Sequence, residues 1–256
     1  MSEPQKNVFR RGTVLLVLVM LVIVAAGILI AHFHYAAINE AEDPRVLEAK
    51  LLYKEYNQAI RDNDAAKAML TLDRIEAVYA AWPDYAHSYE LGVVYNNRAA
   101  IYLGLLLHPV QDTVSRDSLL AEAAYWAGLS IQNYQEWLAD FSDSTPEALL
   151  PETESWYTGL DDMYPEVDVA RVIRKRLEDI QLAQKETPRR LSVAYTNLGI
   201  VHRHQGDYDA AIQCYRQALD LWEANRNAEN NIRILLGQPT KEVSFIEKLF
   251  PADKNK

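Results

Sequence analysis

The stretch AYTNLGIVHRHQGDYDAAIQCYRQALDL, residues 194–221, decides how the rest of this chain is interpreted. It contains two histidines, three aspartates and the chain's only cysteine, residue types that bind metals or serve in catalysis. It also spaces small and aromatic residues at three- and four-residue steps, which is typical of packed helices. The first interpretation predicts an enzyme, and the second predicts a binding scaffold.

The reactive side chains are poorly spaced for a shared metal ion. His202 and His204 are two positions apart, so on a regular helix they point about 200° away from each other. Asp207 fits the N-cap of a following helix, and Cys214 occupies a position typical of a small, partly buried residue. A nucleophilic Cys–His pair stays open as an alternative, because a sequence does not show which side chains meet in space.

The order of apolar and small residues in the same stretch resembles the tetratricopeptide repeat (TPR), a helical hairpin of about 34 residues. The matching positions are Tyr195, Leu198, Gly199, Gly206, Tyr208, Ala211, Tyr215 and Ala218. Tyr195 replaces the family's tryptophan, and His202 replaces its usual tyrosine. Glycine at a helix contact removes the Cβ and lets the neighbouring helix approach closely. The resemblance implies a clear repeat over 191–223.

Weaker copies of the pattern lie upstream. Their residues are Leu91, Gly92 and Tyr95 in a first helix and, as we predict, Ala121, Tyr125 and Gly128 in a second. Apolar residues at helical steps predict an earlier, degenerate hairpin over 44–82. The stretch NAENNIRILLGQP, 227–239, predicts a capping helix, which repeat proteins use to cover their last apolar face. The expected fold is all-α, an α-solenoid of about three TPR-like hairpins plus this cap, preceded by a transmembrane helix.

The N-terminal region carries a long apolar run. GTVLLVLVMLVIVAAGILIAHF, residues 12–33, contains no Asp, Glu, Lys or Arg, and about 20 helical residues cross the hydrocarbon core of a membrane. Two alternatives are a cleaved signal peptide and a buried core helix. Bulky residues follow the run, whereas a signal peptide ends at small residues, and the run is apolar on every face, which disfavours a core helix. We therefore expect a short basic tail over 1–11 and an uncleaved single-pass transmembrane helix over 12–34.

The basic residues near this run predict its orientation. Arg10 and Arg11 precede it directly, whereas the first basic residue on the far side is Arg45. Because Lys and Arg stay preferentially on the cytoplasmic side, we expect a cytoplasmic N-terminus. The TPR domain would then be periplasmic, or extracytoplasmic, at a bacterial inner membrane.

The composition excludes several classes of function. The formal net charge is −10, and an acidic protein lacks the basic face that nucleic acids require. Only 9 glycines occur in 256 residues, and there is no P-loop, dinucleotide fingerprint, zinc-ligand pair or nucleophile elbow. We therefore expect no nucleic-acid partner, no enzyme activity, no metal and no cofactor.

The remaining segments follow from changes in pattern. Three prolines and a run of acidic residues interrupt the helical spacing over 140–165, which we interpret as an acidic loop. The alternatives for it are an acidic docking surface or a cation site using Asp161, Asp162, Glu166 and Asp168. The predicted division is a linker over 35–43, degenerate hairpins over 44–139, this loop, a helix with the clear repeat and cap over 166–237, and a C-terminal tail over 238–256.

The TPR resemblance implies a function as well as a fold. Proteins of this family bind peptides or partner helices along a concave face lined by the first helix of each hairpin. Carried over by position, the groove residues would be Tyr89, Glu90, Val93, Asn96, Thr196, Asn197, Ile200 and Arg203. We expect a membrane-anchored scaffold or adaptor that recruits or assembles envelope complexes through protein partners. The alternatives are a stable accessory subunit of a larger membrane complex, and a metal- or cofactor-dependent enzyme using His202, His204 and Cys214.

Overall fold

The computed structural model describes residues 42–107 and 115–241. Within these ranges every element is a helix and no strand occurs, which confirms the all-α prediction and is consistent with TPR-like hairpins. No helix in the described ranges combines the length and the apolar character that crossing a membrane requires. The predicted transmembrane helix over 12–34 lies outside the described residues, as does most of the C-terminal tail.

The chain divides into two compact units. The larger one comprises Pro44–Trp156 and the chain from Leu177 onward, and the described part of the smaller one comprises Glu42, Asp43 and Tyr157–Arg176. The helix α8 (Val169–Gln205) begins in the smaller unit and continues into the larger one. It enters the predicted repeat without interruption, although Pro188 lies inside it.

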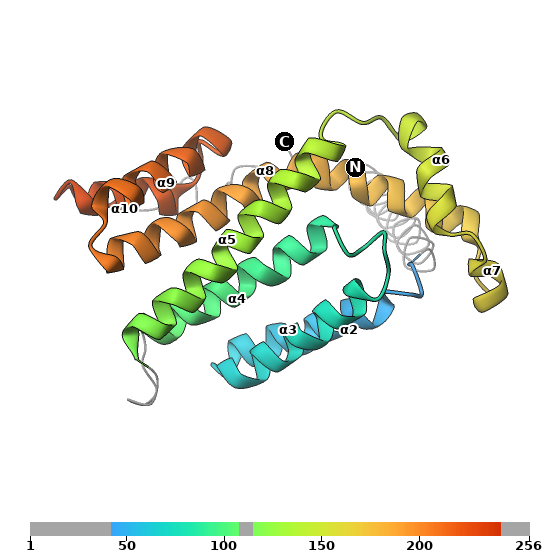
Figure 1. Cartoon of the computed structure of the whole chain (residues 1–256), viewed down its shortest axis with the longest axis horizontal. Helices are drawn as coiled ribbons and strands as arrows, with labels where there is room; N and C mark the ends of the chain where they lie inside the picture. Colours follow the sequence, from blue (N-terminus) through green and yellow to red (C-terminus); the bar gives the residue numbers. More distant parts are fainter. Residues whose placement is uncertain (1–41, 108–114, 242–256) are drawn as a thin grey trace, which may run out of the picture. The chain divides into compact units, whose positions relative to one another are not determined.

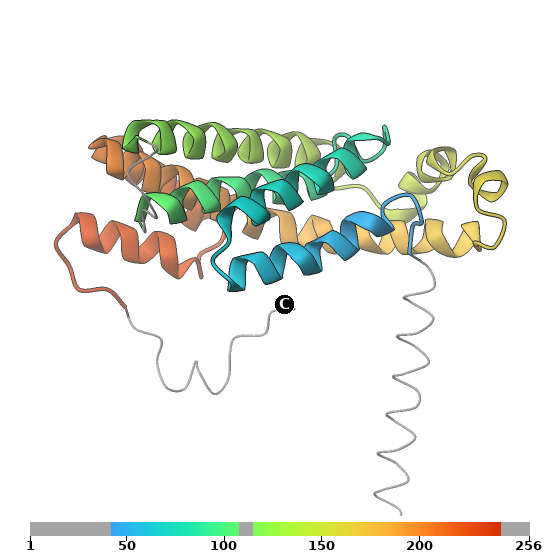
Figure 2. The same ribbon diagram turned by 90° about the horizontal axis from the view of Figure 1, so that it is seen from below.

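The larger unit is built from successive helical hairpins (Figure 1). Its helices are α2 (Leu47–Arg61), α3 (Ala65–Ala80), α4 (Tyr89–Leu107), α5 (Arg116–Phe141), α6 (Pro146–Trp156), most of α8, α9 (Tyr208–Leu221) and α10 (Arg226–Leu235). α2 packs on α3, α3 on α4, α4 on α5, and α9 on α10. The long helices α4 and α5 run side by side in both Figure 1 and Figure 2.

The α2–α3 and α8–α9 turns have the same backbone construction. Asn63 and Gly206 both adopt the left-handed conformation, with φ of 56° and 83°. The next residue, Asp64 or Asp207, caps the second helix by accepting the amide hydrogen three positions later, at 2.9 and 3.1 Å. Its own backbone N–H donates to the carbonyl five residues earlier, at 2.9 and 3.0 Å. The degenerate first hairpin therefore follows the same plan as the clear repeat.

Two buried tyrosines pack directly on glycines. A Cβ added to Gly199 would overlap the ring of Tyr215 in α9, and a Cβ added to Gly92 would overlap the ring of Tyr134 in α5. Both rings are almost fully buried. The glycines are therefore required where the first helix of each hairpin meets the second.

The second of these contacts corrects one sequence prediction. The sequence pattern predicts the second helix of the Gly92 unit on Ala121, Tyr125 and Gly128, but Tyr134 fills the position that Tyr215 has in the clear repeat. Tyr125 is 58% exposed. The reason is that α4 continues 15 residues beyond Gly92, whereas α8 ends six residues beyond Gly199. The matching tyrosine therefore comes later in α5.

The segment expected to be an acidic loop over 140–165 contains two helices. α6 belongs to the larger unit, and the short α7 (Leu160–Met163) belongs to the smaller one. Thr145 caps α6 by accepting the Ala148 amide hydrogen at 3.3 Å, and Pro146 is the first helical residue. Proline is favoured at that position, since its missing N–H has no intrahelical partner there.

Arg45 fixes the end of α6 to the first hairpins. Its guanidinium forms a buried ion pair with Asp84 at 2.8 Å and donates to the backbone carbonyl of Trp156 at 3.0 Å. The same guanidinium lies 5.1 Å from the ring centroid of Trp82. Because both charged groups are almost fully buried, each depends on the other and on these extra contacts for its stability.

Candidate partner-binding surfaces

The predicted groove residues of α4 and α8 meet one another directly. Asn197 in α8 donates a hydrogen bond from Nδ2 to Oδ1 of Asn96 in α4 at 2.9 Å. Both side chains are half-buried. The two side-chain amides are therefore hydrogen-bonded to each other at the contact between α4 and α8.

The α4 groove residues near Tyr89 are also packed. The Tyr89 ring lies edge-on to Trp137 at 5.4 Å, and the Arg190 guanidinium lies 5.2 Å from its centroid. Val93 packs on the same hydrophobic cluster. Glu90 is half-buried. It lies near Tyr53, whose pKa is raised by the burial of the Tyr53 ring and further by Tyr134 and Glu90.

The α8 groove residues contact α9 and α10. Thr196 is buried and accepts a hydrogen bond from Asn225 Nδ2 at 2.9 Å. Ile200 is half-buried and packs on the clusters formed with α5 and α9. Arg203 donates from Nη1 to Asn231 Oδ1 of α10 at 2.8 Å. The eight predicted groove positions thus contribute to the packing between helices.

The positions that define the repeat pattern have mostly interior environments. Leu91, Gly92, Gly199, Ala211, Tyr215 and Ala218 are buried, Tyr95, Tyr195 and Leu198 are half-buried, and Gly206 and Tyr208 are exposed. Tyr95 lies beside the Trp126 ring at 5.8 Å, and the Tyr195 hydroxyl accepts a hydrogen bond from Gln135 at 2.9 Å. The pattern therefore describes packing rather than a binding surface.

Two reactive residues of the opening stretch, Cys214 and His204, have pKa values shifted by their surroundings. Burial raises the pKa of the Cys214 thiol, and Asp207 raises it further, so the nucleophilic thiolate is disfavoured. His204 Nδ1 lies 3.0 Å from Arg116 Nη2. Burial lowers the pKa of His204, and the charges of Arg203 and Arg116 add to this effect. Among residues 42–107 and 115–241, no three His, Cys, Asp or Glu side chains gather in a group that could hold a metal ion.

A cavity of about 340 Å³ lies between the α2–α3 turn and the second half of α4. Its lining residues are Tyr56, Ala59, Ile60, Asn63, Asp64, Ala65, Ala100, Ile101, Gly104 and Leu105. The walls are mainly apolar, with Asn63 and Asp64 as the polar members. Gly104 has open space where a Cβ would stand, unlike Gly92 in the same helix.

Sequence reasoning did not find this cavity. The one available signal was Gly104, a glycine inside an apolar helix where glycine costs about 1 kcal/mol relative to alanine. A glycine inside a helix either lets a neighbour pack closely or leaves a space beside the helix. Here the structure shows space and no packed neighbour.

The family model of the tetratricopeptide repeat matches residues 192–225. This range covers the second half of α8, all of α9 and the N-cap of α10. The match supports the interpretation of this chain as a TPR protein. TPRs are generally non-enzymatic modules that mediate binding to protein partners. No curated protein matches the chain.

Proposed function

We propose that this chain is a membrane-anchored TPR scaffold that binds partner proteins outside the cytoplasm and recruits or assembles envelope complexes. Protein binding is supported by the TPR match at 192–225. Anchoring is supported by the apolar run over 12–34 and the orientation by Arg10 and Arg11, which precede it.

The observation that carries the binding proposal is the apolar cavity beside α4. A volume of about 340 Å³ accommodates large apolar side chains of a bound segment. Asn63 and Asp64 stand at the end of α2 and the start of α3, where they add polar groups to the lining. We therefore assign the cavity to apolar side chains of a partner helix or peptide.

Filling the cavity tests the binding proposal. Gly104→Leu places a side chain in the open space, so partner recovery after crosslinking and purification from membranes should fall strongly. Gly128→Leu in α5 is the matched control, because a Cβ at Gly128 also meets no atom within 4 Å and this residue does not line the cavity. Equal recovery of the same partner with both variants would reject the cavity as the binding site.

A separate experiment tests the anchor and the topology. Deleting residues 1–34 should move the protein from the membrane pellet to the supernatant. A reporter active only outside the cytoplasm should be active when fused to the C-terminus. An active cytoplasmic reporter at that position contradicts the proposed topology, whatever the result for the cavity variants.

A further inference from the structure

The helix α10 is in register with the first helix of the clear repeat. Gly237 lies two residues after the last helical residue of α10, and its φ of 67° is left-handed, like that of Gly206 after α8. The Gln238 N–H donates to the Arg233 carbonyl at 2.8 Å, just as the Asp207 N–H donates to a carbonyl five residues earlier. α10 therefore corresponds to the first helix of a further repeat.

Aligning the two glycines shows which face of α10 would receive a second helix. The α8 positions Leu198, Gly199 and His202 then correspond to Glu229, Asn230 and Arg233 in α10. In α8 this face packs on α9, with Gly199 under the Tyr215 ring. In α10 all three positions are polar, and Asn230 stands where the packing of a second helix requires glycine.

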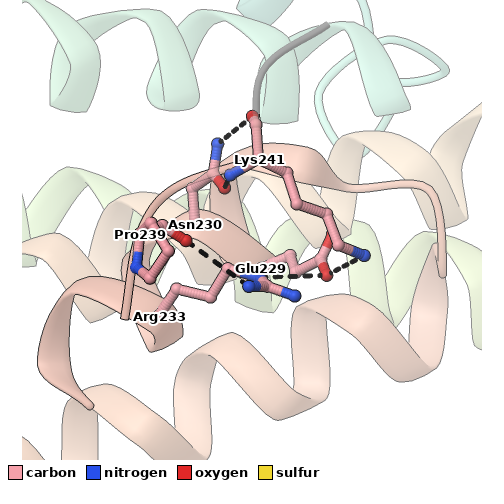
Figure 3. A network of polar contacts seen from close by, with 5 residues as sticks. All are labelled: Glu229, Asn230, Arg233, Pro239 and Lys241. Carbon is pink, nitrogen blue, oxygen red and sulfur yellow. Dashed lines mark hydrogen bonds and ion pairs between the residues drawn. The ribbon is translucent and has the colours of Figure 1, made fainter. Parts of the chain in front are cut away.

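The chain's own residues 238–241, here called the C-terminal strap, cover this polar face (Figure 3). Asn230 Oδ1 accepts the Lys241 backbone N–H at 2.8 Å, and Asn230 Nδ2 donates to the Lys241 carbonyl at 3.3 Å. Arg233 donates to the Pro239 carbonyl at 3.4 Å. The Lys241 ammonium forms an ion pair with Glu229. The strap thus lies where the second helix of a complete repeat would lie.

Three of these contacts are made to the backbone of the strap. One amide side chain pairs with both the N–H and the carbonyl of a single residue, so it recognises backbone independently of sequence. The Glu229 carboxylate adds a preference for a cationic side chain at that residue. Only an extended segment can present its backbone in this way, because a helix uses these groups internally.

We propose that Glu229, Asn230 and Arg233 form a binding site for an extended, lysine-bearing peptide, and that the C-terminal strap is its resident intramolecular ligand. The site is separate from the cavity beside α4, and it does not rest on the function proposed above. The strap is joined to α10 by a short link, which gives it a high effective concentration. An external peptide therefore binds well only when the strap is released.

Amide exchange of the full chain tests whether the strap is held. The Lys241 amide should be protected in the unmodified protein and should exchange at least about tenfold faster in Asn230→Ala, because its acceptor is gone. Asn227→Ala is the matched control, since Asn227 is an exposed asparagine on the same helix. An unprotected Lys241 amide in the unmodified protein, or equal protection in Asn230→Ala, overturns the proposal.

Release of the strap tests whether the site accepts a separate peptide. Lys241→Pro removes the N–H that Asn230 accepts while leaving all three α10 residues in place. A fluorescent peptide of sequence QPTKEV should bind the full-length Lys241→Pro chain at least about tenfold more tightly than the unmodified chain. Adding Asn230→Ala to Lys241→Pro should abolish this binding. No binding to Lys241→Pro, or equal binding to the double variant, contradicts the proposal.

Discussion

At the scale of single residues, the glycines of the larger unit have two opposite roles. Gly92 and Gly199 lie under tyrosine rings and leave no room for a Cβ. Gly104 and Gly128 lie in helices with open space at the same point. The first pair is therefore required for packing, whereas the second pair meets no neighbour at the Cβ position and lowers helix stability relative to alanine.

Alanine at the packed glycines should destabilise the fold. Gly199→Ala forces the buried ring of Tyr215 to move, and overpacking of this kind costs about 1–3 kcal/mol of unfolding free energy. Gly92→Ala should cost a similar amount, because it forces the buried ring of Tyr134 to move. Urea denaturation followed by circular dichroism measures both, and unchanged midpoints would show that the rings relax without cost.

Alanine at Gly104 or Gly128 should stabilise the fold. Gly104→Ala and Gly128→Ala replace glycine in helix interiors without a steric conflict, so each should raise the unfolding free energy by about 0.5–1 kcal/mol. The same denaturation series serves as the measurement. A loss of stability in either variant would indicate a contact that the structure does not contain.

At the scale of elements, one buried asparagine joins three helices. Asn225 caps α10 by accepting the Ala228 amide hydrogen at 3.1 Å. Its Nδ2 donates to the hydroxyls of Ser192 at 2.7 Å and Thr196 at 2.9 Å, both in α8. Ser192 in turn donates to the Ala218 carbonyl of α9 at 2.6 Å.

Removing this side chain should cost more than removing an exposed cap. Asn225→Ala loses the cap and leaves buried hydroxyls with fewer partners, so we expect about 2–4 kcal/mol of destabilisation. Asp64→Ala removes an exposed cap of similar geometry in α3 and should cost about 1 kcal/mol. Thermal and urea unfolding of the two variants compares them, and equal losses would argue against the buried network.

The ion pair between Glu229 and Lys241 predicts a pH dependence of the C-terminal strap. The hydrogen bond and charge of Lys241, together with Arg233, hold the pKa of Glu229 below its ordinary value. The ion pair therefore stabilises the strap on α10 at pH values above the ordinary carboxyl pKa. This stabilisation is lost as the pH falls through the lowered pKa of Glu229. The Lys241 amide shift in NMR titrations should change there, and Glu229→Gln should remove that step.

At the scale of the whole molecule, the sequence predicted helix packing where that packing is local. The spacing of Leu198, Gly199 and Tyr215 reflects local geometry. The helical class was therefore correctly expected, and the family match at 192–225 supports the repeat expected over 191–223. Tyr134 was missed because α4 and α5 exceed the usual hairpin length. The α6 helix was missed because Thr145 and Pro146 signal a helix start as well as a turn.

The candidate site was less accessible to sequence reasoning, for a physical reason. Position within a repeat indicates which side a residue faces, but not what covers that side. The Asn96–Asn197 hydrogen bond joins residues far apart in the sequence, so only the folded chain shows it. The cavity at Gly104 and the strap on Asn230 depend in the same way on which segments meet.

The unequal hairpin lengths also affect how the chain folds. Gly199 and Tyr215 are close in the sequence, whereas Gly92 and Tyr134 are separated by most of α4 and α5. Each doubling of the separation adds about 0.6 kcal/mol of loop-closure entropy, and contacts distant in sequence slow folding. We therefore expect the α2–α3 and α8–α9 hairpins to close first. Pairing of α4 with α5 would then be the slower step, during which apolar helix faces stay exposed to aggregation.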